Sequence, residues 1–306
     1  MAKLQYENYC KNTPTKLVKE KFGDTNVYAQ NTKSLLTKAS GFMAGYDFTL
    51  NPYRGCQYGC SYCYAAAFSP NSQMQKDWGK WVIIKENGAD ILEKELEKWF
   101  KKNPDKSPTI YMSSVTDPYQ PIESKHMLTR SLLEVMYPYC PTLVIQTRSP
   151  IITRDIDILQ RFQHLRVNMS VPTGSESVRR DFEPRSPSIK ARLNAIKKIK
   201  ESIDSLKGFV PKISITITPL LPTLPDDEDF FVQKLKIADR IVIQDFHPSQ
   251  NRSLVASTRE EAEDIKRKYA WWYDSERISY IKFKEKLIVS LPGVEIKEGK
   301  NGFSYE

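Results

Sequence analysis

Three cysteines within eight residues constrain this chain more than any other feature. Cys56, Cys60 and Cys63 follow the spacing C-x3-C-x2-C in a chain that has five cysteines among 306 residues. Cysteines crowded in this way bring sulfur ligands together, as a metal ion or an iron–sulfur cluster requires. A structural zinc site or a ferredoxin-type cluster needs four ligands, and no histidine or fourth cysteine lies close in the sequence. The pattern therefore predicts an iron–sulfur cluster with one iron open to another ligand; a zinc knuckle or chance clustering is the alternative.

The residues around the cysteines resemble a known family. Tyr62 directly precedes the third cysteine, the flanking segment reads NPYRGC…GC…YCYA, and SSVTDPYQPIE follows at residues 113–123. This pattern resembles the radical S-adenosylmethionine (SAM) enzymes, in particular their spore photoproduct lyase-like branch, over roughly residues 45–250.

The resemblance implies both the cofactors and the reaction. A [4Fe–4S] cluster would be held by Cys56, Cys60 and Cys63, and SAM would chelate its open iron through amino and carboxylate groups. An electron from the reduced cluster would cleave SAM, and the resulting 5′-deoxyadenosyl radical would abstract a hydrogen atom from substrate. The resemblance also implies an external one-electron donor such as flavodoxin or ferredoxin.

From about residue 47, short β-branched segments alternate with helical patterns. The predicted strands are Trp81–Lys85, Thr109–Ser113, Thr142–Thr147, Arg166–Val171, Lys212–Thr218 and Arg240–Phe246. The predicted helices between them include Ile91–Lys102, His126–Tyr137, Asp155–Phe162 and Ile189–Leu206. Such alternation predicts an α/β fold with parallel strands and crossover helices. The family resemblance implies a partial (β/α)6 TIM-like barrel, whose chemistry would lie at the C-terminal ends of the strands.

Three regions are predicted along the chain. Residues 1–44 form an N-terminal extension over the core, with short helices as one option, and residues 45–250 form the partial barrel. Residues 251–306 form a small helical C-terminal segment, with helices at 258–273 and 275–290 and a short hairpin at Gly293–Tyr305. Aromatic residues interleave with cations over Lys266–Lys286, which suits stacking on bases. Packing of amphipathic helices on the barrel is the favoured interpretation of that segment.

Candidate SAM contacts follow two strand ends. The resemblance assigns Ser114, Thr116 and Asp117 to the amino group of SAM, since hydroxyls and a carboxylate can hold an ammonium. It assigns Arg148 to the SAM carboxylate, where spore photoproduct lyase has a lysine. An ordinary strand-to-loop turn is the alternative for the first three residues.

Three further residues are assigned by the resemblance, which leaves the catalytic residues unknown. Tyr62 would lie near the adenine, unless it is a plain core residue, and Asn168 and Ser170 would contact the ribose. Asn168 alternates with apolar neighbours and could instead be a polar position on one strand face. The loop from Glu183 to Pro187 resembles a family loop of unknown role, and a plain helix-entry turn is the favoured interpretation of it.

One difference from spore photoproduct lyase bears on the product radical. Ser114 stands where that enzyme has its hydrogen-donating cysteine, and a serine O–H bond is too strong to replace a thiol S–H. Cys140 is predicted to lie on the far side of the barrel, and Cys10 could reach the site only through the N-terminal extension. Phenolic donors near the mouth are a third option, at Tyr58, Tyr64 and Tyr119. Literal repair of thymine dimers is therefore not expected.

The charge and hydropathy of the chain indicate its class of partner and its cellular location. A net charge of +9 admits a polyanionic partner such as nucleic acid, although mild basicity is common. No apolar run has transmembrane length and the first residues lack a signal-peptide pattern, so the sequence predicts a cytoplasmic protein without a membrane partner. A nucleobase or nucleic acid is the favoured substrate, followed by a peptide or small metabolite. A non-catalytic iron–sulfur protein is the alternative from another class.

Overall fold

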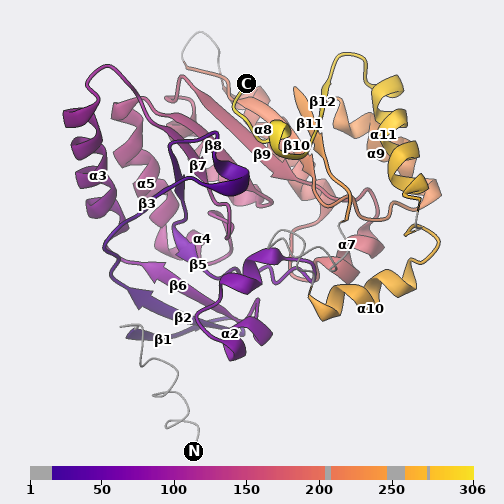
Figure 1. Ribbon diagram of the computed structural model, residues 1–306, viewed down its shortest axis with the longest axis horizontal. Helices are drawn as coiled ribbons and strands as arrows, with labels where there is room; N and C mark the ends of the chain where they lie inside the picture. Colours follow the sequence, from indigo (N-terminus) through magenta and orange to yellow (C-terminus); the bar gives the residue numbers. More distant parts are fainter. Residues whose placement is uncertain (1–15, 204–207, 247–258, 274–275) are drawn as a thin grey trace, which may run out of the picture.

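The main sheet of this protein is an open barrel of mostly parallel strands (Figure 1). The computed structural model describes residues 16–203, 208–246, 259–273 and 276–306, so Cys10 lies outside the described residues. The sheet has the strand order β12-β11-β10-β9-β8-β7-β4-β3. Neighbours from β4 to β12 run parallel, whereas β3 is antiparallel to β4. The six parallel strands from β4 to β11 confirm the predicted partial (β/α)6 barrel.

The five predicted strands from residue 109 onward all lie in this sheet, close to their predicted bounds. Its strands are β3 (Leu36–Lys38), β4 (Phe48–Leu50), β7 (Thr109–Met112), β8 (Thr142–Thr147), β9 (Leu165–Ser170), β10 (Lys212–Ile217), β11 (Arg240–Ile243) and β12 (Glu295–Glu298). β9 illustrates the alternation that made these strands predictable. Val167 and Met169 pack into the apolar core, while the alternate residues Asn168 and Ser170 share the opposite face of the strand.

Helices cover the apolar face of the sheet. They are α3 (Gly88–Lys102), α4 (Glu123–His126), α5 (Leu128–Met136), α6 (Ile156–Leu159), α7 (Glu176–Phe182), α8 (Ile189–Ser202) and α9 (Pro225–Leu235). α8 begins where the Ser188 side chain caps the Ala191 amide, and it buries Ile196 and Ile199 as its periodicity predicts. The helix predicted at Asp155–Phe162 is shorter, because a 3-10 turn at Pro150–Asp155 occupies its start.

A second sheet of four strands lies apart from the barrel, on the side of the cysteine loop (Figure 1). Its order is β1-β2-β6-β5, with β1 (Lys16–Phe22), β2 (Thr25–Gln30), β6 (Trp81–Lys85) and β5 (Tyr53–Arg54). The segment Trp81–Lys85 is thus a strand, as predicted, but it belongs to this small sheet. The described part of the N-terminal extension contributes strands rather than α-helices.

The C-terminal segment joins the main sheet. α10 (Glu260–Lys268) and α11 (Ile278–Ser290) confirm two helices, and Tyr269, Trp272 and Phe283 are buried, as the packing interpretation expects. The predicted hairpin is wrong: β12 pairs in parallel with β11, and α12 (Gly299–Gly302) follows. The segment forms a strand of the main sheet because it pairs with β11, which is distant in the sequence, at the edge of that sheet. None of the described helices is both long and apolar enough to traverse a lipid bilayer.

Candidate cluster and cofactor site

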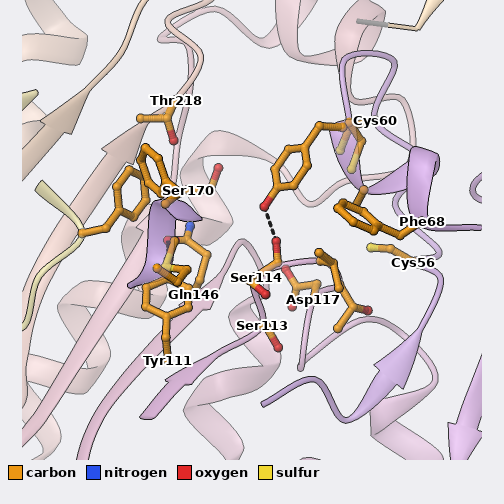
Figure 2. A pocket seen from close by; sticks show the side chains of 18 of the residues that line it. Cys56, Cys60, Phe68, Tyr111, Ser113, Ser114, Asp117, Gln146, Ser170 and Thr218 are labelled. Atoms are coloured by element: carbon orange, nitrogen blue, oxygen red, sulfur yellow. Dashed lines mark hydrogen bonds between the residues drawn. The ribbon is translucent and has the colours of Figure 1, made fainter. Parts of the chain in front are cut away.

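A cavity of about 710 Å³ lies at the C-terminal ends of the barrel strands (Figure 2). Nine of the ten predicted site residues line it: Cys56, Cys60, Tyr62, Cys63, Ser114, Thr116, Asp117, Arg148 and Ser170. The tenth, Asn168, is fully buried inside the barrel and does not line the cavity. Its side-chain amide has no hydrogen-bond partner among the described residues. The cavity therefore brings the cysteine loop together with side chains at the ends of three parallel strands, β7, β8 and β9, as the parallel topology predicts for those three.

Main-chain packing positions the cysteine loop. Gly59 and Gly79 both have positive φ angles, and a Cβ atom on Gly79 would lie only 2.8 Å from the Gly59 Cα atom. Gln57 and Gln120 fix the same loop, because the Gln120 side chain accepts from the Gln57 amide at 2.9 Å. The Ser61 amide donates to the carbonyl of Phe182 at 2.9 Å. The loop is therefore held by contacts that leave its thiols free to face the cavity.

The three thiols are largely protected from solvent and close enough to influence one another. Burial raises the pKa of the Cys60 thiol to about 12, although the charge of Arg148 opposes this effect. Burial also raises the pKa of Cys56 and Cys63, and the neighbouring thiols add to the effect at Cys56. No three His, Cys, Asp or Glu side chains in the described part of the chain are arranged to hold a metal ion.

Arg148 links this loop to a buried carboxylate. Its Nη1 atom donates to the Cys60 sulfur at 2.9 Å and forms an ion pair with Glu183. The Tyr62 hydroxyl also donates to Glu183, and Arg192 binds the other carboxylate oxygen. Burial opposes the charge of Arg148, but Cys60 and Glu183 outweigh it and raise the pKa of the guanidinium. Glu183 thus orients a cation that touches a cysteine sulfur.

Sequence reasoning missed the role of Glu183. The segment from Glu183 to Pro187 was interpreted as a plain helix-entry turn, yet Glu183 is fully buried. Burial raises its pKa, but Arg148 and Arg192 outweigh burial and the net pKa is lowered. The sequence signal for this role was the resemblance of the loop to a family loop. Its ion pair with Arg148 could not be predicted, because Arg148 lies 35 residues away in the sequence.

The side chains of Asp117 and Thr116 already form hydrogen bonds within the protein. The Asp117 carboxylate accepts from the Arg148 amide at 2.8 Å, the Thr147 hydroxyl at 2.7 Å and the Tyr119 amide at 2.9 Å. Thr116 donates to the Gly55 carbonyl at 2.6 Å. Both residues line the cavity, but their hydrogen bonds fix the loops around Arg148.

Ser113 is a further residue that sequence reasoning did not assign. It follows β7 with φ of 75°, a conformation that L-residues rarely adopt. Ser113 is among the residues that line the cavity, and its hydroxyl is buried and has no partner among the described residues. A strained residue with an unpaired hydroxyl at a strand end indicates a ligand contact.

Among the three candidate phenol donors, only Tyr64 lines the cavity. Its hydroxyl donates to the Ser114 carbonyl, and the labelled Ser114 lies at the centre of the view in Figure 2. Tyr58 instead donates to the carbonyl of Tyr119 at 3.2 Å. Cys140 is exposed at the start of β8, away from the cavity, as predicted.

The family model of the radical SAM superfamily matches residues 50–235, more than half of the chain. The chain belongs to the radical SAM superfamily. Membership confirms the predicted cofactor pair, a [4Fe–4S] cluster and SAM. This radical SAM protein is 35% identical over 184 residues to an uncharacterized protein of Methanocaldococcus jannaschii, covering 60% of this chain and 64% of that one. An uncharacterized protein of Mycobacterium tuberculosis is 27% identical over 215 residues, covering 66% and 58%. The chain thus spans less than two thirds of the length of both relatives.

The radical SAM chain also shares its fold with a structurally known enzyme. Spore photoproduct lyase complexed with dinucleoside spore photoproduct is 14% identical, with a TM-score of 0.58, covering 88% of this chain and 81% of that one. A doubly substituted variant of that enzyme with bound AdoMet and the dinucleoside gives a TM-score of 0.60 at 14% identity and the same coverage. At such identity the likeness shows a common fold.

The residues of the cavity fit the two cofactors. Three thiols supply the soft ligands that iron–sulfur clusters require. The hydroxyl of Ser113 and the guanidinium of Arg148 are groups of the kind that can bind an amino acid moiety. The volume of about 710 Å³ falls within the range of small-molecule and cofactor sites.

Proposed function

We propose that this protein is an enzyme that holds its [4Fe–4S] cluster through Cys56, Cys60 and Cys63, uses SAM to start a radical reaction, and acts on a nucleobase or nucleic acid. The observation that carries the enzymatic part is the single cavity that joins these thiols to Arg148. The chemistry that the cofactor pair supplies when bound is a 5′-deoxyadenosyl radical, formed together with methionine by one-electron cleavage of SAM.

Arg148 is proposed to bind the SAM carboxylate. All three of its side-chain contacts use Nη1, so Nε and Nη2 donate to no other described residue. These two nitrogens form one edge of the guanidinium, and that edge can bind a carboxylate with two parallel hydrogen bonds. Glu183 binds Nη1, so the guanidinium is oriented before SAM binds.

The remaining contacts are proposed by role. Ser113 and Ser114 would approach the amino group of SAM, with Thr116 and Asp117 holding their loop. Tyr62, whose ring lies 6.2 Å from that of Phe246, would flank the adenine. Ser170 would reach the ribose, while Asn168 would act from inside the barrel.

The substrate assignment rests on the other end of the cavity. Phe42, Tyr111 and Phe303 line it, with ring centroids of the first and last 5.4 Å apart. The amide of Gln146 lies against them, since the Tyr111 hydroxyl donates to its oxygen at 3.0 Å. Aromatic rings beside an amide suit a planar, polar ring such as a base. The net charge of +9 supports a polyanionic carrier of that base.

Repair of thymine dimers by thiol hydrogen donation is not part of the proposal. Within the described residues, the thiols that line the cavity are the three proposed cluster ligands. Ser114 supplies a hydroxyl in place of a thiol, and Tyr64 is a phenol within the cavity. Clean conversion of spore-type thymine dimers to two thymines would contradict this part of the proposal.

An external one-electron donor, flavodoxin or ferredoxin, is proposed to reduce the cluster. A cytoplasmic location is proposed as well, because a reducing compartment preserves free thiols such as these.

The decisive experiment is anaerobic reconstitution followed by incubation with dithionite and SAM. We expect about four iron and four sulfide per chain, and formation of 5′-deoxyadenosine. Stoichiometric zinc without iron would contradict the cluster assignment. The nucleic-acid proposal has its own test: binding to single-stranded oligonucleotides should fall log-linearly with salt between about 50 and 200 mM. Absent binding at low salt would favour a peptide or small metabolite.

A further inference from the structure

A second, smaller pocket lies behind one wall of the cofactor cavity. It has a volume of about 280 Å³ and is lined by Asn51, Arg54, Phe68, Trp78, Trp81 and Lys85, among others. It shares Ala65, Phe68, Trp78 and Val115 with the cofactor cavity. None of the cluster cysteines lines it. The two hollows are therefore neighbours across one layer of side chains.

Two cations place their charged ends at the wall of this pocket. Lys85 Nζ donates to the Asn51 carbonyl at 2.7 Å, and Arg54 Nη2 donates to the Phe68 carbonyl at 3.1 Å. Each cation makes one such hydrogen bond, so most of its N–H donors remain available to a ligand. Neither forms an ion pair with a carboxylate in the part of the chain that the structure describes.

The charges of these two side chains are not offset within the pocket. Burial, and then the charge of Arg54, lower the pKa of Lys85 to about 8, while Glu95 opposes this from a distance. Burial likewise lowers the pKa of Arg54. Two like charges in a partly buried site destabilise each other, and a bound anion would remove that repulsion.

Trp78 supplies an independent observation. Its side chain is only 6% exposed, and its Nε1–H donor has no partner among the described residues. The neighbouring Trp81, by contrast, donates to the Met74 carbonyl at 2.7 Å. Buried donors are almost always paired, and Trp78 lies in the wall shared by the two pockets, so its unpaired donor indicates an absent acceptor in one of them.

We propose that the Arg54–Lys85 pocket, defined by Arg54, Trp78 and Lys85, binds a phosphate group. Phosphate presents several acceptor oxygens, matches the planar donor edge of arginine and neutralises both cations. The phosphate belongs either to a nucleic-acid backbone, whose base would enter the adjacent cavity, or to a free phosphate or phosphorylated metabolite. Phosphate binding here requires neither cofactor, because the site uses none of the residues assigned to the cluster or SAM; the nucleic-acid alternative rests on the proposed function.

The test is calorimetric titration of inorganic phosphate into the reconstituted protein at low ionic strength. We expect saturable binding that weakens by about tenfold or more in Lys85→Gln and in Arg54→Gln, since each loses a charge-assisted contact. Glutamine at position 85 keeps a donor for the Asn51 carbonyl, and thermal melting reports whether each variant is folded. Lys80→Gln is the matched control, because Lys80 is exposed just before β6 and should change affinity by less than about twofold.

A single-stranded oligonucleotide distinguishes the two sources of phosphate. If the pocket takes a backbone phosphate, the oligonucleotide competes with inorganic phosphate and binds Lys85→Gln more weakly than the parent. If the oligonucleotide neither competes nor distinguishes the variants, the pocket serves free phosphate or a phosphorylated metabolite. No saturable phosphate binding by the parent, or equal binding by parent and folded variants, would overturn the proposal and leave both cations as clamps on the cysteine loop.

Discussion

The two walls of the cofactor cavity are built in different ways. The cysteine loop is held by main-chain contacts, such as the close approach of Gly59 to Gly79. The strand-end wall is held by charge: Asp117 binds the Arg148 amide, and Glu183 binds the Arg148 guanidinium. On the first wall the backbone holds the loop, and the Cys60 sulfur contacts Arg148 of the second wall at 2.9 Å. On the second the side chains are bound to one another before any ligand arrives.

This difference predicts different responses to substitution. The cysteine loop should lose its geometry when a cysteine or a glycine is substituted, because that geometry depends on the close approach of two backbone segments. The strand-end wall should fail when one charge is removed, because each buried charge there is offset by another. The expected effects can be ranked.

Cys60→Ala should have the largest effect on the loop wall. Loss of one of three thiolates should abolish cluster binding, so that reconstituted protein loses nearly all of its iron and sulfide. Cys140→Ala is the control, since Cys140 is exposed and remote from the cavity. Metal analysis and the visible absorption of the cluster measure the result. Full iron content in Cys60→Ala would show that Cys60 is not a ligand.

Glu183→Gln should have the largest effect on the strand-end wall. It leaves Arg148 and Arg192 buried without their carboxylate, which should lower the free energy of unfolding by about 3–5 kcal/mol. Glu176→Gln is the control, because its ion pair with Arg179 is partly exposed and should contribute at most about 1 kcal/mol. Denaturant unfolding of the two variants without cluster measures both. Equal stabilities would mean that the buried network does not organise this wall.

Gly79→Ala should disturb the loop wall without touching a ligand. Its φ of +95° and the 2.8 Å approach to Gly59 should cost roughly 2–4 kcal/mol through backbone strain and overpacking. Gly45→Ala should be nearly neutral, because nothing lies within 4 Å of an added Cβ there. Unfolding free energy and iron content of the two variants would separate the effects. A neutral Gly79→Ala would show that the loop can relax without losing its geometry.

Arg148→Ala leaves Glu183 paired with Arg192 alone, so it should also destabilise the strand-end wall. Its effect on ligand affinity is the smallest effect in this ranking. Loss of a charge-assisted contact should weaken SAM binding by about 1.5–3 kcal/mol. Asp117→Ala should weaken it too, by displacing the Arg148 main chain. Exposed Arg180→Ala is the control. Equilibrium binding of SAM to anaerobic reconstituted protein provides the measurement, and parent-like affinity in both site variants would refute the assignment.

The sequence by itself determined the features that depend on local spacing. The interval between Cys56 and Cys63 specified a three-thiol site, and the apolar period of α8 specified its buried face. Strand periodicity located β7, β8 and β9 closely enough to place Asp117, Arg148 and Ser170 at one edge of the sheet. These inferences hold because ligand spacing and amphipathic period are set over a few residues.

The tertiary structure alone decided what depends on partners distant in the chain. β6 joined the small sheet and β12 joined the barrel because of the edges available to them. Glu183 became a buried counter-ion because α7 and β8 bring it to Arg148 across 35 residues of sequence. Lys85 and Arg54 share a pocket because β5 and β6 pair in antiparallel register. Periodicity shows which face of an element is apolar, but the free energy of pairing an edge or a buried charge depends on what the rest of the chain places beside it.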